Sequence, residues 1–461
     1  MFFDRKDLLS KQTIELYNNM ATSGNCTGRL QARLQVFPSP LIIWEFEALG
    51  DTACTPNEVD GKLEHPLVGS GFSITEPIVR GPLQKPIPEQ TVHRVETVHG
   101  VAREACFGES SIQAHSFTFY LPNARFQIVS FEGQDIIKET VRAITGEDSR
   151  FISSGIVGHI LSASIDGTWD VHLDTSGEPY KWLDPNQENG GTLITTTGHL
   201  YPSKKDSEET EQEIEAPSLS IDEALSKIGT LTALLSFANG GYLGPLYVEG
   251  SQRDGKKFKF SANILAHLTT PLEQIGTTWL TRESDLKAYI QCYPAFDQMI
   301  RVPPWNESFD LILAWYFQAI QPQNTQSRGK PWPIVANAVG AALERLCAAI
   351  LVKERNIRGL KGAREKTEHL LKLIGITKRR GYDDIDYVDD FWKTRNDATH
   401  PRQNASLTNN ERNEVVWRAI QWVEEALLWR LGYNGKYRDR LNQSNVPIEP
   451  RYDLSLRNPS W

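Results

Sequence analysis

The spacing of hydrophobic residues changes its period part-way along this chain. Up to about residue 200, apolar and polar residues alternate, as they do through Leu30–Val36. A period of two places one face of a β-strand inward. From Ser284 onward, apolar residues recur every three or four positions, which is the period of an amphipathic helix. The sequence therefore predicts an α+β protein, with a β-rich N-terminal region followed by an all-α C-terminal helical bundle.

Pro and Gly clusters such as Pro38-Ser39-Pro40 separate many of the strand-like runs. Parallel βαβ units would need helical stretches between the strands, and few are present, so we expect an antiparallel sandwich or a barrel-like sheet. The expected strands are Leu30–Val36, Ile43–Phe46, Phe72–Val79, Thr91–Val98, Phe117–Leu121, Phe126–Phe131, Trp169–Leu173 and Thr192–Leu200.

A chain of 461 residues is too long for one hydrophobic core. We expect a β-rich recognition or sensor region over residues 1–301 and a helical bundle over residues 302–461. Inside the first region, residues 203–217 are polar and acidic and are expected to form a linker, with mixed α/β structure from residue 218. There, Ser220 and Glu223 form a capping box for a helix, and a hairpin of Leu246–Glu249 and Phe258–Leu265 follows.

Five amphipathic helices are expected in the C-terminal part, each with an apolar stripe that a bundle would bury. The last of them begins at a second capping box, formed by Thr408 and Glu411. The expected helices are Ser308–Ile320, Pro333–Lys353, Gly362–Ile374, Asp384–Thr399 and Asn409–Leu431.

Composition limits the compartment and the class of site. No run approaches the roughly 18 apolar residues of a membrane span, and the first residues lack a signal-peptide pattern, so we expect a cytoplasmic protein without membrane contact. The five cysteines are widely spread and include no C-x-x-C pair, which predicts reduced thiols and no cysteine zinc site. We expect no metal and no cofactor.

Charge is unevenly distributed along the chain. The net charge is −9, which argues against a protein that coats nucleic acid. Residues 328–461 nevertheless contain 24 Lys and Arg against 17 Asp and Glu, an excess of seven positive charges, so the remainder carries −16. A basic C-terminal third on an acidic body favours local contact with an anion, although a solvated surface has the same composition.

One short motif near the C-terminus combines the groups needed for phosphate chemistry. Arg395 and Asn396 are followed by His400, and Pro401 stops the helix directly afterwards. A guanidinium offers a planar fork to phosphate oxygens, and an imidazole titrates near neutral pH and can act as acid or base. The amide of Asn396 could orient the phosphate or hold the arginine.

The spacing within this motif has a geometric consequence. Asn396 and His400 are four residues apart and share a helix face, whereas Arg395 lies about 140° away from His400 round an unbroken helix. Either the helix breaks near His400, which Pro401 would encourage, or the working site draws on two chains. A twofold axis would place two Arg395 and two His400 side chains round one cleft.

The motif resembles the R-x(4–6)-H signature of HEPN domains, in the R-N-x-x-x-H form of HEPN ribonucleases. Pro331-Trp332-Pro333 and the following Ala341–Leu346 also resemble ApeA-like antiphage defence proteins, and the similarity covers about Val302–Leu431. The N-terminal region is similar to theirs only in layout. The resemblance implies a homodimeric, metal-independent endoribonuclease that cleaves RNA by 2′-OH attack, with a defence or toxin-like role.

The resemblance also implies an acidic residue on the second helix of the domain, for which Glu344 is the candidate and Glu354 the weaker alternative. In the loop before the motif, three consecutive basic residues could bind RNA phosphates as substrate-binding groups, or could simply be solvated. They are Lys378, Arg379 and Arg380.

Two other interpretations remain open at this point. A helix-end arginine or histidine is often a surface cap, in which case the bundle would only assemble the β domain. The bundle could also be a non-catalytic HEPN module for dimerisation or nucleotide binding that presents the N-terminal region to a partner. Under the nuclease interpretation, the expected partners are RNA, a second copy of the chain, and a phage-derived or host protein trigger.

Overall fold

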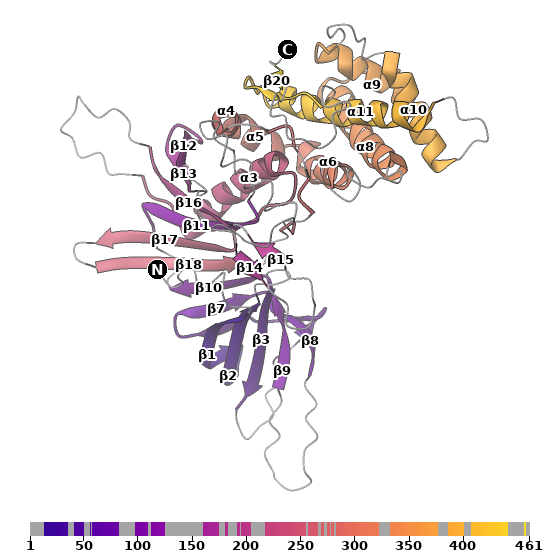
Figure 1. The fold of residues 1–461 in the computed structure, drawn as a ribbon. Coiled ribbons are helices and arrows are strands. Elements are labelled where there is room, and N and C mark those ends of the chain that lie inside the picture. Colours follow the sequence, from indigo (N-terminus) through magenta and orange to yellow (C-terminus); the bar gives the residue numbers. More distant parts are fainter. Residues whose placement is uncertain are drawn as a thin grey trace, which may run out of the picture.

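The computed structural model of the chain is α+β, as the sequence predicts: an antiparallel sheet precedes a C-terminal set of helices (Figure 1). The described residues are 13–35, 41–49, 56, 58–82, 97–108, 112–124, 160–174, 180–182, 191–193, 195–203, 217–254, 257–265, 269–271, 274–276, 278–280, 283–321, 332–376, 386–400, 407–440 and 456–457. Most of the expected linker over residues 203–217 lies outside them.

Sixteen strands form one antiparallel sheet, in the order β12-β13-β16-β11-β17-β18-β10-β7-β6-β1-β2-β3-β9-β8-β5-β4. Two further pairs, β14 with β15 and β19 with β20, stand apart from it. The strands are β1 (Thr13–Ser23), β2 (Cys26–Gln35), β3 (Leu41–Ala48), β4 (Glu58–Val59), β5 (Lys62–Leu63), β6 (Leu67–Gly69), β7 (Phe72–Thr75), β8 (Ile78–Pro82), β9 (Thr97–Ala102), β10 (Glu104–Gly108), β11 (Ser116–Pro122), β12 (Ile160–Ser164), β13 (Trp169–Asp174), β14 (Tyr180–Trp182), β15 (Gly191–Leu193), β16 (Thr195–Pro202), β17 (Tyr247–Asp254), β18 (Lys257–Leu265), β19 (Tyr437–Arg438) and β20 (Leu456–Arg457).

The expected strands fall on described strands with three differences. The run Thr192–Leu200 falls on two strands, β15 and β16, of which β15 pairs with β14 outside the large sheet. The run Phe72–Val79 is divided into β7 and β8, because Glu76 turns the chain with a φ of 52° and Pro77 follows it. The run Phe126–Phe131 and most of Thr91–Val98 lie outside the described residues.

The sheet has two hydrophobic cores. The first lies among β1–β3, β7, β9 and β10 and contains the fully buried Trp44 and Phe46. The second lies between β11, β13 and β16 and the helices that cover them, and it continues through the C-terminal helices. Strand β11 contributes to both, because Phe119 faces the second core while the next residue, Tyr120, faces the first. Because successive side chains of a strand point to opposite faces, this one strand contributes to two cores.

Helix α3 (Ile221–Asn239) covers the second core, together with α4 (Glu283–Ile290) and α5 (Tyr293–Ile300). Its capping box is present as expected: Ser220 accepts a hydrogen bond from the Glu223 N–H, and Glu223 accepts one from the Ser220 N–H. The helix ends at Gly240, whose φ of 76° is the left-handed conformation that glycine adopts without strain.

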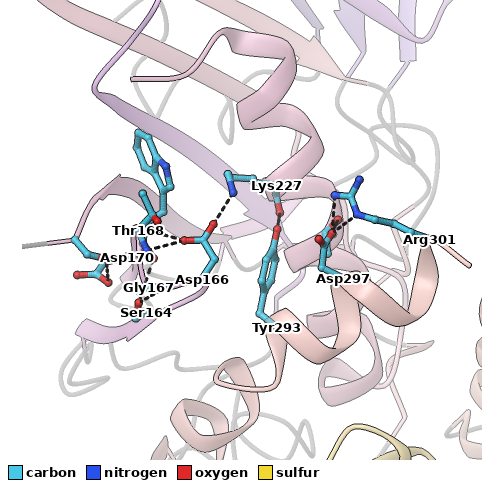
Figure 2. A network of polar contacts seen from close by, with 12 residues as sticks. Ser164, Asp166, Gly167, Thr168, Asp170, Lys227, Tyr293, Asp297 and Arg301 are labelled. Atoms are coloured by element: carbon cyan, nitrogen blue, oxygen red, sulfur yellow. Dashed lines mark hydrogen bonds and ion pairs between the residues drawn. The ribbon is translucent and has the colours of Figure 1, made fainter. Parts of the chain in front are cut away.

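A polar network joins the β12–β13 turn to these helices (Figure 2). Asp166 accepts hydrogen bonds from the N–H groups of Thr168 and Trp169, at 2.9 and 2.8 Å. It also pairs with Lys227 of α3 at 2.5 Å, and the carbonyl of Lys227 accepts the hydroxyl of Tyr293 at 3.3 Å. Burial raises the pKa of Asp166, but Lys227 and the two N–H groups outweigh burial, so this pKa lies below its ordinary value.

The C-terminal helices match the expected ones closely. The second differs, because its last seven residues, Ala348–Glu354, form a π-helix (η2) that the hydrophobic pattern does not distinguish from an α-helix. The helices are α6 (Trp305–Ile320), α8 (Trp332–Cys347), α9 (Gly362–Leu373), α10 (Asp386–Thr399) and α11 (Asn409–Arg430).

Of two expectations from composition, the one about the cysteines needs correction. The stretch Trp332–Glu354 is long and apolar enough to cross a membrane, with a mean hydropathy of 1.7, although 67% of it is buried inside the fold, as in the core helix of a bundle. Among the described cysteines, Cys106, Cys292 and Cys347 are free thiols, whereas Cys26 is disulfide-bonded. Wide separation along the sequence does not limit how close two cysteines lie in the fold.

Candidate active site

Helix α10 carries the candidate motif and is anchored by its apolar face. Phe391 and Trp392 are buried. The Phe391 ring meets Trp422 of α11 with the ring centroids 6.1 Å apart, and the Trp392 indole N–H donates to Thr367 of α9 at 3.2 Å. These contacts fix the rotation of α10 about its axis and therefore the directions in which residues 395–400 point.

Arg395 lies where α10 packs against α8. A Cβ added at Gly340 would lie 3.2 Å from Cγ of Arg395, so the absence of a side chain at Gly340 leaves room for the arginine stem. The guanidinium Nη2 is 3.9 Å from Oε1 of Glu344, one helical turn further along α8. The two side chains are 32% and 48% exposed, which leaves both within reach of a ligand.

This pair is loose. A separation of 3.9 Å brings the charges together without a hydrogen bond. The Nε of Arg395 is buried and has no hydrogen-bond partner in the part of the chain that the structure describes. The fold thus brings together two residues 51 positions apart in the sequence, and it leaves the donors of Arg395 uncommitted.

Asn396 and His400 lie on an exposed part of α10. The N–H of His400 donates to the carbonyl of Asn396 at 2.8 Å, and the hydroxyl of Thr399 donates to the same carbonyl at 3.0 Å. Helical hydrogen bonding therefore continues up to His400, and no break separates Arg395 from His400. Within one chain, the guanidinium and the imidazole start from different faces of the helix.

A second arginine near the motif was missed by the sequence analysis. Arg412 of α11 pairs with Asp397 at 3.3 Å, with side chains only 10% and 14% exposed, and its guanidinium lies 4.6 Å from the ring centroid of Trp332. These contacts join α8, α10 and α11 beside the motif. The sequence did contain a signal, because Arg412 is a cation in the first turns of a helix. The helix dipole disfavours a positive charge there, so an acidic partner is expected.

Glu354 has a different environment from Glu344. It accepts hydrogen bonds from Nε and Nη2 of Arg430, at 2.8 and 2.6 Å, and from the indole of Trp305 at 2.7 Å. All its described contacts hold η2 against α6 and α11. Of the two carboxylates considered from the sequence, only Glu344 lies beside Arg395.

Comparison with known proteins gives one match, and it covers this part of the chain. Residues 302–449 match the YopA C-terminal domain family. The match includes Glu344, Arg395, Asn396 and His400, and it spans less than half of the chain. No curated protein matches the chain, and no solved structure does. A β-rich N-terminal region followed by a YopA-like helical region is therefore the layout of this protein.

The YopA-like segment extends beyond α11, and a buried ion pair accounts for the fold of that extension. Arg440 donates to both carboxylate oxygens of Glu424, at 2.9 and 2.5 Å, and their side chains are 3% and 0% exposed. The hydroxyl of Tyr316 in α6 donates to the same carboxylate at 2.5 Å. The segment after α11 is thus bound to α11 and α6 by charge and not only by apolar packing.

The remaining candidates in the YopA-like segment add no further site. Lys378, Arg379 and Arg380 lie outside the described residues. Burial raises the pKa of Cys347, the last residue of α8, to about 12, so its thiol is not a nucleophile. No group of three or more His, Cys, Asp or Glu among the described residues could hold a metal ion.

Proposed function

We propose that this chain is a metal-independent endoribonuclease of the HEPN, ApeA-like type, acting as a homodimer in the cytoplasm. Arg395, Asn396 and His400 of two subunits would form the site, with Glu344 beside Arg395. The observation that carries the proposal is the contact between α8 and α10, where Arg395 lies beside Glu344 with free donors while His400 is exposed five residues further on.

The chemistry follows from the residue types. The RNA 2′-OH attacks the adjacent phosphorus, the bond to the 5′-oxygen breaks, and the products carry a 2′,3′-cyclic phosphate and a 5′-hydroxyl. One imidazole takes the proton of the 2′-OH, and another group protonates the leaving oxygen. The guanidinium of Arg395 stabilises the charge that builds up on the non-bridging oxygens. Glu344 attracts the guanidinium from 3.9 Å away, and the amide of Asn396 binds the phosphate.

We infer that a second copy docks on exposed apolar residues of α6 and α8. Leu311 and Trp315, on α6, are 41% and 40% exposed, and Ile334, on the neighbouring α8, is 51% exposed. Exposed apolar side chains mark an interaction site where they form one contiguous patch, and the proposed dimer would bury these three together. Since Arg395 and His400 lie on different faces of α10, a partner subunit would supply the group that one chain cannot bring to the same phosphate.

Cleavage of total RNA in the presence of EDTA tests the proposal. We expect the wild type to cut and His400→Ala to lose at least about a hundredfold in rate, the usual contribution of acid–base catalysis. His369→Ala, on α9 of the same bundle, is the matched control and should keep full activity. Equal cleavage by His400→Ala and the wild type would contradict the proposal.

Mixing two inactive variants tests the shared site. Arg395→Ala and His400→Ala should each be inactive as homodimers, whereas subunit exchange would form heterodimers that retain one arginine and one histidine. We expect the mixture to be more active than either parent. A mixture as inactive as its parents, with exchange verified by mass spectrometry, would exclude complementation between subunits.

A non-catalytic module for dimerisation or nucleotide binding is the second candidate. The stem of Arg395 packs on Gly340 and its guanidinium faces Glu344, which a purely structural arginine would also do. Under this alternative neither the wild type nor His400→Ala would cut RNA in EDTA.

Antiphage defence is the proposed biological role, with the N-terminal region as the receptor of a phage-derived or host protein trigger. Its acidic charge relative to the C-terminal third would favour a basic partner surface. Cells that express the wild type should restrict phage growth, and cells with His400→Ala should not.

A further inference from the structure

The turn between η2 and α9 concentrates positive charge. Residues 353–366, here called the basic turn, contain six Lys and Arg against two acidic residues. Their exposed basic side chains are Lys353, Arg355, Arg358, Lys361 and Arg364. A cluster of this density on a chain of net charge −9 is a local departure from the rest of the molecule.

The two acidic residues of the basic turn bind groups other than its exposed basic side chains. Glu354 is bound by Arg430 and Trp305 inside the bundle. Glu365 accepts a hydrogen bond from the backbone N–H of Lys361 at the start of α9. Arg364 is the one exposed cation of the turn that pairs with acids, Glu368 and Asp389. The other four have no ion pair within the described residues. Of these, Arg355 lies over the Trp429 ring, 5.8 Å from its centroid, and Arg358 donates a hydrogen bond to the Asn356 side chain at 3.0 Å.

The basic turn is held in a fixed shape. Asn356, Gly359 and Gly362 have φ angles of 52°, 88° and 78°, which bend the chain tightly. Ile357 and Leu360 pack against the hydrophobic core, and the N–H of Ile357 donates to the carbonyl of Leu351 at 2.8 Å. The apolar side chains therefore point inward between cations that point outward.

The basic turn also lies at a defined place relative to the candidate site. The bond between Arg364 and Asp389, at 2.6 Å, joins it to the beginning of α10, and His400 follows the last residue of the same helix. His400 is eleven positions after Asp389, which is about 16 Å along the axis at 1.5 Å per residue. A strand of a few nucleotides spans this distance.

We propose that the basic turn binds the phosphate backbone of single-stranded RNA and leads the strand along α10 to the Arg395–His400 site. This inference rests on the proposed ribonuclease function and gives it a substrate-binding surface separate from the chemistry. Four basic side chains without an ion pair, held on a turn of fixed shape, form a surface that suits a polyanion. An anionic membrane is the less favoured ligand, because Ile357 and Leu360 are turned into the core and cannot insert among lipids.

The test measures binding of a 2′-O-methyl RNA oligonucleotide, which cannot be cleaved by 2′-OH attack, to the full chain. The variant is Lys353→Gln/Arg358→Gln/Lys361→Gln. The control, Arg33→Gln/Arg103→Gln/Lys287→Gln, removes three exposed charges from β2, the β9–β10 turn and α4. Fluorescence anisotropy at several salt concentrations gives the affinity and its salt dependence, and thermal melting verifies that both variants fold.

We expect the basic-turn variant to bind the RNA roughly tenfold more weakly. The slope of log affinity against log salt should become less steep by about 2, since each single-strand phosphate contact contributes about 0.7 and three cations are removed. The control should match the wild type. Equal affinity and slope in the two variants would overturn the proposal, as would binding of phosphatidylserine vesicles that depends on the basic turn while RNA binding does not. If the basic turn governs RNA binding but His400→Ala still cuts RNA, the proposed active site fails and this surface stands.

Discussion

Gly340 allows α10 to come close enough to α8 for Arg395 to reach Glu344. Any side chain at this position would compete with the stem of Arg395 for the same space. The candidate site thus depends on Gly340, which carries no functional group. The effect of a substitution at Gly340 on function can be separated from its effect on stability.

Gly340→Ala should keep or raise the melting temperature while lowering RNA cleavage by about tenfold or more, because a displacement of a fraction of an ångström at Arg395 is costly in catalysis. Alanine gains roughly 1 kcal/mol of helix propensity over glycine, which offsets the tight contact at 3.2 Å. Thermal melting and initial cleavage rates measure the two effects.

Gly229→Ala is the matched control for this substitution. Gly229 lies within α3, and an added Cβ there would meet nothing within 4 Å. The control should be stabilised and should cleave at the wild-type rate. Full cleavage by Gly340→Ala would show that the α8–α10 spacing does not govern the activity.

At the scale of single elements, α11 connects the candidate site with the rest of the bundle. Its first turn carries the Thr408–Glu411 capping box, and the next residue, Arg412, pairs with Asp397 of α10. Fraying of the N-terminal end of α11 would therefore break the ion pair between Arg412 and Asp397, which lies near the C-terminus of α10.

Thr408→Ala should lower the free energy of unfolding by about 1 kcal/mol, the usual effect of losing an N-cap side chain, and should also reduce cleavage. Chemical denaturation gives the first quantity, and the RNA assay gives the second. Ser220→Ala removes the same motif from α3 and should cost similar stability without an effect on the cleavage rate of the folded protein. A similar loss of cleavage in both variants would assign the effect to general destabilisation.

At the scale of the whole molecule, buried charges hold distant segments together. Arg440 and Glu424 are buried as a pair that joins the segment after α11 to the bundle. Burial lowers the pKa of Arg438 to about 10, with Arg440 adding to the effect. The C-terminal segment therefore has a specific electrostatic partner on α11, and removal of one member leaves the other uncompensated.

Arg440→Met should destabilise the protein by about 3–5 kcal/mol, because Glu424 would remain as an unpaired buried charge. The double variant Arg440→Met/Glu424→Gln should be more stable than Arg440→Met alone, since it removes that charge. Urea unfolding of the two variants measures the difference. A double variant less stable than the single one would show that the ion pair is not the main interaction.

The Asp166 network predicts how acid affects the junction between sheet and helices. The pKa of Asp166 is depressed in the folded protein, so its stabilising contribution is complete above the ordinary carboxyl value of 3.8 and is lost as pH falls through the lower folded value. Asp166→Asn should therefore lower the melting temperature at pH 6 and show a smaller difference from the wild type near pH 3. A difference that is constant between these pH values would contradict the assignment.

The sequence by itself determined the local structure of this protein. Capping boxes at Ser220 and Thr408, alternation in strands such as β2 and apolar stripes in α10 and α11 are short-range signals, and each predicts a described element within a few residues. The candidate motif is also local, since Arg395, Asn396 and His400 lie within one helical turn and a half. The π-helix at Ala348–Glu354 was missed, because a buried apolar run has no feature that marks it.

Only the tertiary structure decided which of these elements are neighbours. Pairing of β10 with β18, the two cores served by β11, and the approach of Glu344 to Arg395 join residues far apart in the chain. Periodicity tells which face of a strand or helix is buried but not which partner buries it. That choice is made by side-chain packing over the whole molecule, as the missing side chain at Gly340 shows for the packing of Arg395 against α8.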